Sequence, residues 1–285
     1  MTNPPVVQEH FVEVDGIRTR YLSSGSGKPV VLLHAVGMCA ETFYPNLSGL
    51  SDRYRVIAVD LPGHGYSHAL EMGDAAPQAL FAAHVIALMD RIEIDQFALA
   101  GSSFGALVAA LAYFLQPERV KALGLVGSGS VFHTAETQKM GFVGTRANGT
   151  RAMRNPTVEG CFERLKNIVF DPYCIPYSVA RAQSEIYTLP DRLGAYEAVI
   201  DGTVATIDQP DARVLERLES IRCATAVIVG RNDIRADWQC HVDGAGRIAD
   251  SRVHVYDRCG HLPYLEHPDK FNGHFAQLLA DAGFC

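Results

Sequence analysis

The sequence lacks the features that mark nucleic-acid-binding and membrane-spanning proteins. Its 25 Lys and Arg are outnumbered by 32 Asp and Glu, the net charge is −7 at pH 7, and no basic cluster could neutralise phosphates. No stretch approaches the roughly 20 apolar residues that cross a membrane, and residues 1–9 show no basic region followed by an apolar core. These absences predict a cytoplasmic protein that binds neither nucleic acid nor membrane.

Paired cysteines and metal-binding motifs are also missing. The seven cysteines include no Cys-x-x-Cys pair, and an odd number cannot all pair within one chain, so reduced thiols are predicted. No cluster has the spacing of metal ligands, and the sequence implies no metal and no organic cofactor. The 285 residues, 48% of them hydrophobic, suffice for one large domain or for a core with an inserted subdomain.

One segment places a serine between two glycines, where an apolar run ends and a helical pattern begins. The run Phe-Ala-Leu-Ala predicts a buried strand that stops at Gly-Ser-Ser-Phe-Gly, residues 101–105, and residues 106–112 favour a helix. The glycines permit a strained turn that would hold the Ser103 hydroxyl clear of the sheet, above the helix N-terminus. Ser103 is therefore the candidate nucleophile.

Apolar strands alternate with helical patterns on both sides of this segment. Alternating runs around Asp15-Gly16 predict an antiparallel β-hairpin at one edge of a sheet. We expect buried strands at 29–33, 54–60, 97–100, 120–126, 225–230 and 252–256, and helices at 78–92, 106–112 and about 268–280. This α/β alternation implies a twisted, mostly parallel sheet flanked by helices, with a ligand site beyond the carboxyl ends of the strands.

The alternation breaks after Gly127. From about 133 to 211 the sequence offers no convincing buried strand, only helical stretches at 158–169, 177–187 and 193–206. We therefore expect a helical cap, residues 132–211, inserted into a core that comprises residues 1–131 and 212–285.

A serine hydroxyl is a poor nucleophile at neutral pH, so Ser103 needs a base and a carboxylate that orients the base. Asp233 and His261 lie in the loops after the last two predicted strands, at the same sheet edge as Ser103. The order Ser, Asp, His along the chain is one of the known orders of a catalytic triad. Asp60 also ends a strand and is the main rival for the acid, but we assign it a structural role at its turn.

An oxyanion requires preorganised amide groups beside the nucleophile. The amide of Phe104, directly after Ser103, is one candidate. The loop at residues 34–37, after the strand 29–33, should supply the other, which we assign to Val36. We expect His34 to shape this loop by hydrogen bonding and assign it no proton transfer.

Five motifs together resemble the α/β-hydrolase family over essentially the whole chain; they are residues 34–37, 60–67, 101–105, 229–233 and 260–261. Within that family the sequence most resembles the meta-cleavage product hydrolases, which hydrolyse a carbon–carbon bond in vinylogous 1,5-diketones formed by aromatic ring cleavage. The similarity is carried by residues 259–261, 266–267, 271–272, 168–172 and 179–181. It implies that Arg181 in the cap binds the substrate carboxylate, whereas the residues alone allow a solvated helix arginine equally well.

Four features depart from the pattern of the meta-cleavage product hydrolases: Ser102 replaces Asn, residues 36–39 replace a Pro-Gly-Ala-type loop, Leu262 replaces Trp, and residues 63–65 read Gly-His-Gly. The predicted function is a serine hydrolase that cleaves a carbon–carbon bond in a small ring-fission product. A carboxylesterase or lactonase with the same residues is an alternative, as is a ligand-binding protein on a hydrolase fold. Under each of these interpretations the protein could be a homo-oligomer.

Overall fold

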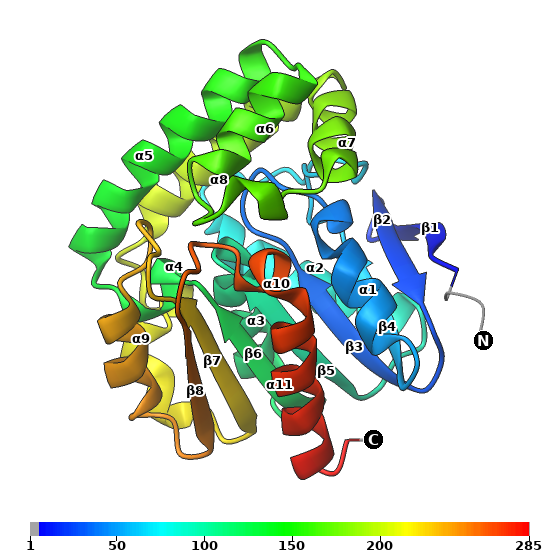
Figure 1. Cartoon of the computed structure of the whole chain (residues 1–285), viewed down its shortest axis with the longest axis vertical. Helices are drawn as coiled ribbons and strands as arrows, with labels where there is room; N and C mark the ends of the chain where they lie inside the picture. Colours follow the sequence, from blue (N-terminus) through cyan, green and yellow to red (C-terminus); the bar gives the residue numbers. More distant parts are fainter. Residues whose placement is uncertain (1–5, 285) are drawn as a thin grey trace.

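The computed structural model describes residues 6–284, which fold around one eight-stranded sheet (Figure 1). The strands are β1 (Gln8–Val14), β2 (Ile17–Ser24), β3 (Lys28–Leu33), β4 (Tyr54–Val59), β5 (Phe97–Ser102), β6 (Val120–Val126), β7 (Ala224–Gly230) and β8 (Ser251–Tyr256). Their order across the sheet is β1-β2-β4-β3-β5-β6-β7-β8. Only the β1–β2 and β2–β4 pairs are antiparallel, which confirms the mostly parallel sheet and the hairpin at its edge.

Helices cover both faces of the sheet. They are α1 (Tyr44–Leu50), α2 (Pro77–Arg91), α3 (Phe104–Leu115), α9 (Trp238–Ala245), α10 (Pro263–Glu266) and α11 (Pro268–Asp281). In Figure 1, α1 and α11 lie in front of the sheet, whereas α2 and α3 lie behind it. Side chains along β3 alternate between the two faces of the sheet. Val30 and Leu32 pack on the side of α1 and α11, whereas Val31 and Leu33 pack on the side of α2 and α3. This sandwich of layers explains the run of apolar residues in β3.

Five helices between β6 and β7 form a layer above the carboxyl ends of the strands, here called the helical layer (Figure 1). They are α4 (Gly129–Phe132), α5 (Ala135–Arg154), α6 (Val158–Lys166), α7 (Tyr177–Tyr187) and α8 (Arg192–Thr206). Three of them match the predicted helical stretches, but the 20-residue α5 was not predicted. Its glycines at 141, 144 and 149 weaken the helical signal, since glycine costs about 1 kcal/mol relative to alanine in a helix. The boundaries of the cap at 132 and 211 remain a prediction.

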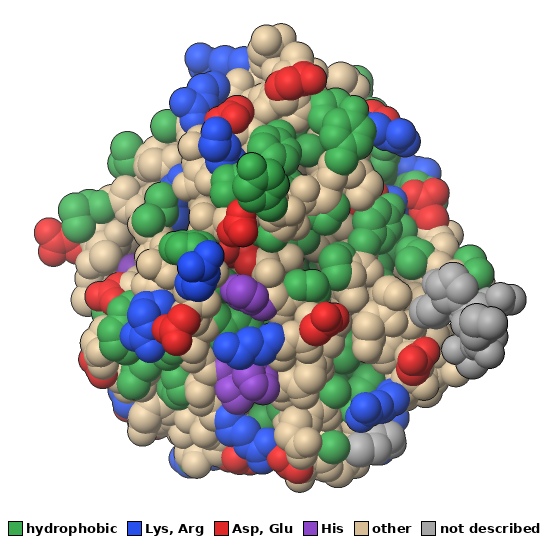
Figure 2. All heavy atoms as spheres, in the orientation of Figure 1, with side chains coloured by type: hydrophobic (Ala, Val, Ile, Leu, Met, Phe, Trp, Pro, Cys, Tyr) green, Lys and Arg blue, Asp and Glu red, His purple; other side chains and the backbone are tan. Residues whose placement is uncertain are grey.

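Two further features concern the helices and the surface charges. None of the helices that the structure describes in residues 6–284 has the length and apolar character needed to cross a membrane. Acidic and basic side chains are interspersed over the face shown in Figure 2, and they do not separate into one positive and one negative area there.

The turn between β5 and α3 is strained and closely packed. Ser103 has a φ of 54° and a ψ of −117°, a conformation that L-residues rarely adopt. A Cβ atom on Gly101 would lie 2.1 Å from the carbonyl oxygen of Gly105, and a Cβ on Gly105 would lie 2.3 Å from that of Leu33. Both positions therefore require glycine, because only a missing side chain lets α3 start directly against β5 and β3.

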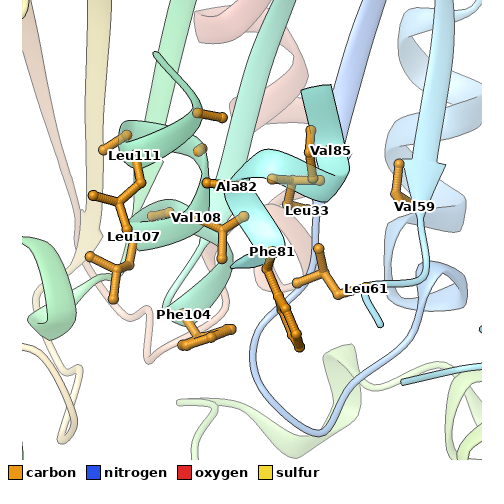
Figure 3. Packing of buried hydrophobic residues seen from close by; sticks show 14 of the residues in the cluster. Leu33, Val59, Leu61, Phe81, Ala82, Val85, Phe104, Leu107, Val108 and Leu111 are labelled. Atoms are coloured by element: carbon orange, nitrogen blue, oxygen red, sulfur yellow. The ribbon is translucent and has the colours of Figure 1, made fainter. Parts of the chain in front are cut away.

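Aromatic rings support this turn from the side of α2 (Figure 3). Phe81 of α2 and Phe104 of α3 are each 1% exposed, and their rings meet edge to face with centroids 5.8 Å apart. Figure 3 also shows Leu61 beside Phe81 and Val108 near both helices. The ring contact holds Phe104, the residue after Ser103. Packing of α2 therefore contributes to the geometry at the end of β5.

We expect Phe81→Ala to lower the free energy of unfolding by about 3–5 kcal/mol, because it leaves a cavity against Phe104. Leu115→Ala is the matched control, since Leu115 is 52% exposed and its truncation should cost about 0.5 kcal/mol or less. Urea unfolding followed by circular dichroism measures both values. Equal losses in the two variants would show that this aromatic contact is not a major part of the core.

Candidate active site

Ser103, Asp233 and His261 meet at the carboxyl edge of the sheet, after β5, β7 and β8 respectively. Nδ1 of His261 lies 2.8 Å from Oδ2 of Asp233, whose side chain is completely buried. Ser103 and His261 line one pocket of about 50 Å³ under the helical layer. A neutral imidazole that donates from Nδ1 keeps Nε2 as an acceptor, which is the form that a general base needs.

The carboxylate of Asp233 is held on both oxygens. Its Oδ1 accepts hydrogen bonds from the backbone N–H groups of Arg235 at 2.7 Å and Ala236 at 3.1 Å, and its Oδ2 faces His261. These bonds orient the carboxylate toward the imidazole. The geometry therefore suits Asp233 to orient a base.

Asp60, the rival carboxylate, has different partners. Its Oδ2 lies 2.9 Å from Nη1 of Arg20, and its Oδ1 accepts from the N–H of Ala40 at 2.7 Å. Both charged side chains are buried, and the N–H of Tyr66 also donates to Asp60 at 3.0 Å. The carboxylate thus joins β2 to the loops after β3 and β4, which agrees with the structural role expected from the sequence.

Val36 and Phe104, the two predicted oxyanion residues, line the same pocket as Ser103. Phe104 is the first residue of α3, so its N–H has no intrahelical acceptor and lies at the positive end of the helix dipole. His34 accepts the N–H of Leu61 at Nε2, 3.1 Å away, and its Nδ1 lies 2.8 Å from the carbonyl oxygen of Ala35. His34 therefore ties the loop after β3 to the loop after β4, as expected.

The structure does not bring Arg181 to this pocket. Its side chain is 64% exposed, and its Nε lies 3.2 Å from Oε1 of Glu185 one turn along α7. It lines a separate hollow that also includes Glu9 and Tyr66. The buried positions of α7 include Val179 and Ala180, so Arg181 lies on the opposite, solvent-facing side of the helix. The structure therefore places Arg181 outside the pocket of Ser103 and His261, and its contact with a substrate carboxylate stays a prediction.

Two other arginines reach the site instead. Arg164 of α6 is 5% exposed, Arg235 follows β7, and both line the part of the site that contains Ser103 and His261. Within residues 6–284, neither guanidinium forms an ion pair with a carboxylate. Burial lowers the pKa of Arg235, and the nearby charges of Arg164 lower it further while Tyr196 and Asp233 raise it. The site therefore holds two guanidinium groups that form no direct ion pair within residues 6–284, which favours an anionic ligand.

The sequence contained no signal for these two arginines. Arg164 lies in Glu-Arg-Leu-Lys, a charged run that is typical of a solvated helix face. Arg235 lies two residues after Asp233 in a polar loop, where an exposed side chain is the ordinary expectation. Only the tertiary structure shows that Arg164 faces inward, where its Nη2 donates to the carbonyl oxygen of Val36.

A parallel sheet in this order, with a strained serine after β5 and a His–Asp pair after β7 and β8, defines an α/β hydrolase. The model of the α/β-hydrolase fold family matches residues 28–268 of the chain. The protein therefore belongs to the α/β-hydrolase family, and it is an enzyme of the hydrolase class. This confirms the fold class predicted from the sequence.

Within the family, the chain is similar to hydrolases of ring-fission products. A 2-hydroxymuconate semialdehyde hydrolase from a Pseudomonas species is 29% identical over 98% of this chain and 96% of its own length. A 2-hydroxy-6-oxononadienedioate/2-hydroxy-6-oxononatrienedioate hydrolase from Paraburkholderia phymatum is 30% identical over 93% of this chain and 90% of its own length. The solved structure of a meta-cleavage product hydrolase from Pseudomonas fluorescens has the same fold, with a TM-score of 0.80 at 24% identity over 96% of this chain and 98% of that one. The resemblance stated from the sequence is confirmed.

The two carboxylates should respond differently to removal of their charge. We expect Asp233→Asn to lower kcat about ten thousand-fold with little loss of stability, because His261 loses the acceptor that orients it. Asp60→Asn should instead lower the free energy of unfolding by about 3–5 kcal/mol, because it leaves Arg20 buried with less counter-charge. Thermal unfolding and turnover, measured on both variants, test the assignment, and the reverse pattern would make Asp60 the catalytic acid.

We expect the folded protein to lose stability in mild acid, because three of its histidines are buried. Burial lowers the pKa of His34 to about 4, of His64 to about 3 and of His241 to about 4. In the unfolded chain these groups titrate near pH 6.5, so below that pH the unfolded state binds more protons than the folded state. Their contribution to stability is complete above about pH 6.5 and is lost as the pH falls toward 4.

The urea midpoint should therefore fall steadily between about pH 6.5 and pH 4.5. His241→Gln should make this fall shallower, because one of the titrating groups is gone. A midpoint that stays constant over the range would contradict the prediction.

Proposed function

We propose that this protein is a serine hydrolase in which His261 activates Ser103 and Asp233 orients His261. The amides of Val36 and Phe104 form the oxyanion hole in this proposal. The observation that carries it is the 2.8 Å contact between His261 and the buried Asp233, in the pocket that the strained Ser103 lines.

The proposed reaction is hydrolysis of a carbon–carbon bond in a ring-fission product. A dienol substrate first becomes its keto tautomer, after which the oxygen of Ser103 attacks the ketone carbonyl and passes its proton to His261. Collapse of the tetrahedral intermediate breaks the carbon–carbon bond, and the electron pair leaves as a dienolate whose carbon takes the proton from His261. Water, activated by the same histidine, then hydrolyses the acyl-enzyme and restores Ser103.

Two findings support this substrate class. The curated relatives are named as hydrolases of 2-hydroxymuconate semialdehyde and of 2-hydroxy-6-oxononadienedioate. Products of this kind carry carboxylates, and the site holds Arg164 and Arg235 without acidic partners among residues 6–284. We assign recognition of the substrate carboxylate to this pair in place of Arg181. The helical layer, proposed as a cap over residues 132–211, supplies Arg164.

Hydrolysis of a small ester or enol-lactone is the second candidate, because the same triad attacks either carbonyl. Two positions favour it: Ser102 and Leu262, both buried beside the site, stand where the meta-cleavage product hydrolases have Asn and Trp. Both positions are next to a residue of the proposed triad in the chain, and the triad itself is unchanged.

A parallel assay separates the candidates. The purified protein and its Ser103→Ala variant are incubated with a ring-fission dienone and with a short p-nitrophenyl ester. We expect the native protein alone to remove the dienone absorbance, far faster than it cleaves the ester. Turnover of the ester without turnover of the dienone would support the triad, but it would show that the proposed substrate class is wrong. Failure of Ser103 to react with an active-serine phosphonate probe would instead favour a ligand-binding protein.

The arginines allow a sharper test of the carboxylate assignment. We expect Arg235→Gln to raise KM for the anionic dienone about 10- to 100-fold, since a hydrogen bond to a charged group contributes about 1.5–3 kcal/mol. KM for the neutral ester should change little. Arg181→Gln is the matched control and should leave both values unchanged, because its side chain is exposed and paired with Glu185. A raised KM for the dienone in the Arg181 variant would instead show that Arg181 binds the substrate carboxylate, as the resemblance implies.

A further inference from the structure

We infer that Tyr187 and Arg164, two side chains of the helical layer, position the oxyanion loop, residues 34–38, for catalysis. The inference rests on the proposed function, because it takes Val36 as an oxyanion donor. Tyr187 and Arg164 are positioning residues for the Val36 amide, since they act on the backbone of this loop.

The contacts are direct and short. The hydroxyl of Tyr187 donates to the carbonyl oxygen of Gly37 at 2.6 Å. Nη2 of Arg164 donates to the carbonyl oxygen of Val36 at 3.2 Å, and its Nη1 donates to the hydroxyl oxygen of Tyr187 at 2.7 Å. Two neighbouring side chains from α6 and α7 therefore hold two successive peptide groups of the loop.

The side chains act on a tight turn within this loop. The N–H of Met38 donates to the carbonyl oxygen of Ala35 at 3.0 Å, and Gly37 has a φ of 70°. This is the pattern of a turn in which the third residue is left-handed. Rotation of the peptide between Val36 and Gly37 would convert this turn to the common type in which the third residue is right-handed, and it would re-aim the Val36 carbonyl and the Gly37 N–H. The hydrogen bond from Arg164 selects one of the two orientations.

Three successive carbonyls of the loop are thus held from two sides. The carbonyl of Ala35 faces the N–H of Met38 and Nδ1 of His34, both within the loop. The next two carbonyls, those of Val36 and Gly37, depend on the helical layer. The helical layer therefore supplies the donors for two of the three carbonyls.

Tight packing makes these bonds sensitive to loss. Arg164 is 5% and Tyr187 is 7% exposed, so water does not readily replace a missing donor. A Cβ atom on Gly37 would lie 2.6 Å from the ring of Tyr196 and 2.7 Å from Nη2 of Arg164. Burial also raises the pKa of Tyr187, which keeps its hydroxyl protonated as a donor.

The chain offers a matched pair of tyrosines for the test. Tyr187 and Tyr196 each donate to a backbone carbonyl at 2.6 Å, and both are buried. The acceptor of Tyr187 is in the oxyanion loop, whereas that of Tyr196 is Thr145 in α5. Phe at either position removes one buried hydroxyl and keeps the ring, so both variants should lose a similar amount of stability.

The readout is the rate at which an active-serine phosphonate phosphonylates Ser103. This reaction uses the oxyanion hole and does not depend on the identity of the natural substrate. We expect Tyr187→Phe to lower this rate, and kcat on whichever substrate is turned over, about 10-fold or more, with KM within about 3-fold of the native value. Tyr196→Phe should stay within about 2-fold of the native rate at the same folded fraction.

The outcomes separate the two proposals. Equal rates in the two variants, or a change confined to KM, would overturn the positioning role while leaving the serine hydrolase intact. Absence of labelling in the native protein would overturn the proposed function itself. A slow rate confined to Tyr187→Phe supports both.

Discussion

The close approach of α3 to β5 and β3 is the constraint on which the site depends. Because Gly101 and Gly105 carry no side chains, the chain reverses within a few residues and leaves Ser103 in a strained conformation at the sheet edge. β3 is the neighbour of β5 in the sheet, so the loop after β3 ends beside the same serine. Val36 and Phe104, from segments far apart in the sequence, therefore line one pocket with Ser103.

Arginine side chains of the core and of the site serve different ends in this fold. Arg20 lies among the carboxylates of Glu9, Glu41 and Asp60, so its charge is balanced and it joins loops of the core. Arg164 and Arg235 have no such balance among the described residues and lie beside the nucleophile. A buried charge without a partner costs stability, and its retention is understandable where a ligand supplies the opposite charge. Burial alone thus does not distinguish a structural arginine from one that awaits a ligand, whereas the charge balance does.

The sequence could predict the sheet, because each central strand is a continuous apolar run bounded by turn residues, and β5 is followed at once by the serine motif. It could also nominate Ser103, Asp233 and His261, since the carboxyl ends of parallel strands share an edge. It did not predict α5, whose glycines and low hydrophobicity hide a helix that tertiary packing stabilises. It also assigned Arg181 to the pocket, although its direction depends on how α7 docks.

The amino-acid sequence by itself determined the order and type of the core elements and the chemistry at their ends, because these follow from local patterns of apolar residues, glycines and strand-terminal polar groups. Only the tertiary structure decided which arginines face the serine and which side chains hold the oxyanion loop. Arg164, Tyr187 and Arg181 all lie on charged or mixed helical segments, and their sequences do not specify the rotation of each helix against the core. That rotation is set by packing between distant segments, so the contacts of Arg164 and Tyr187 with Val36 and Gly37 exist only in the folded chain.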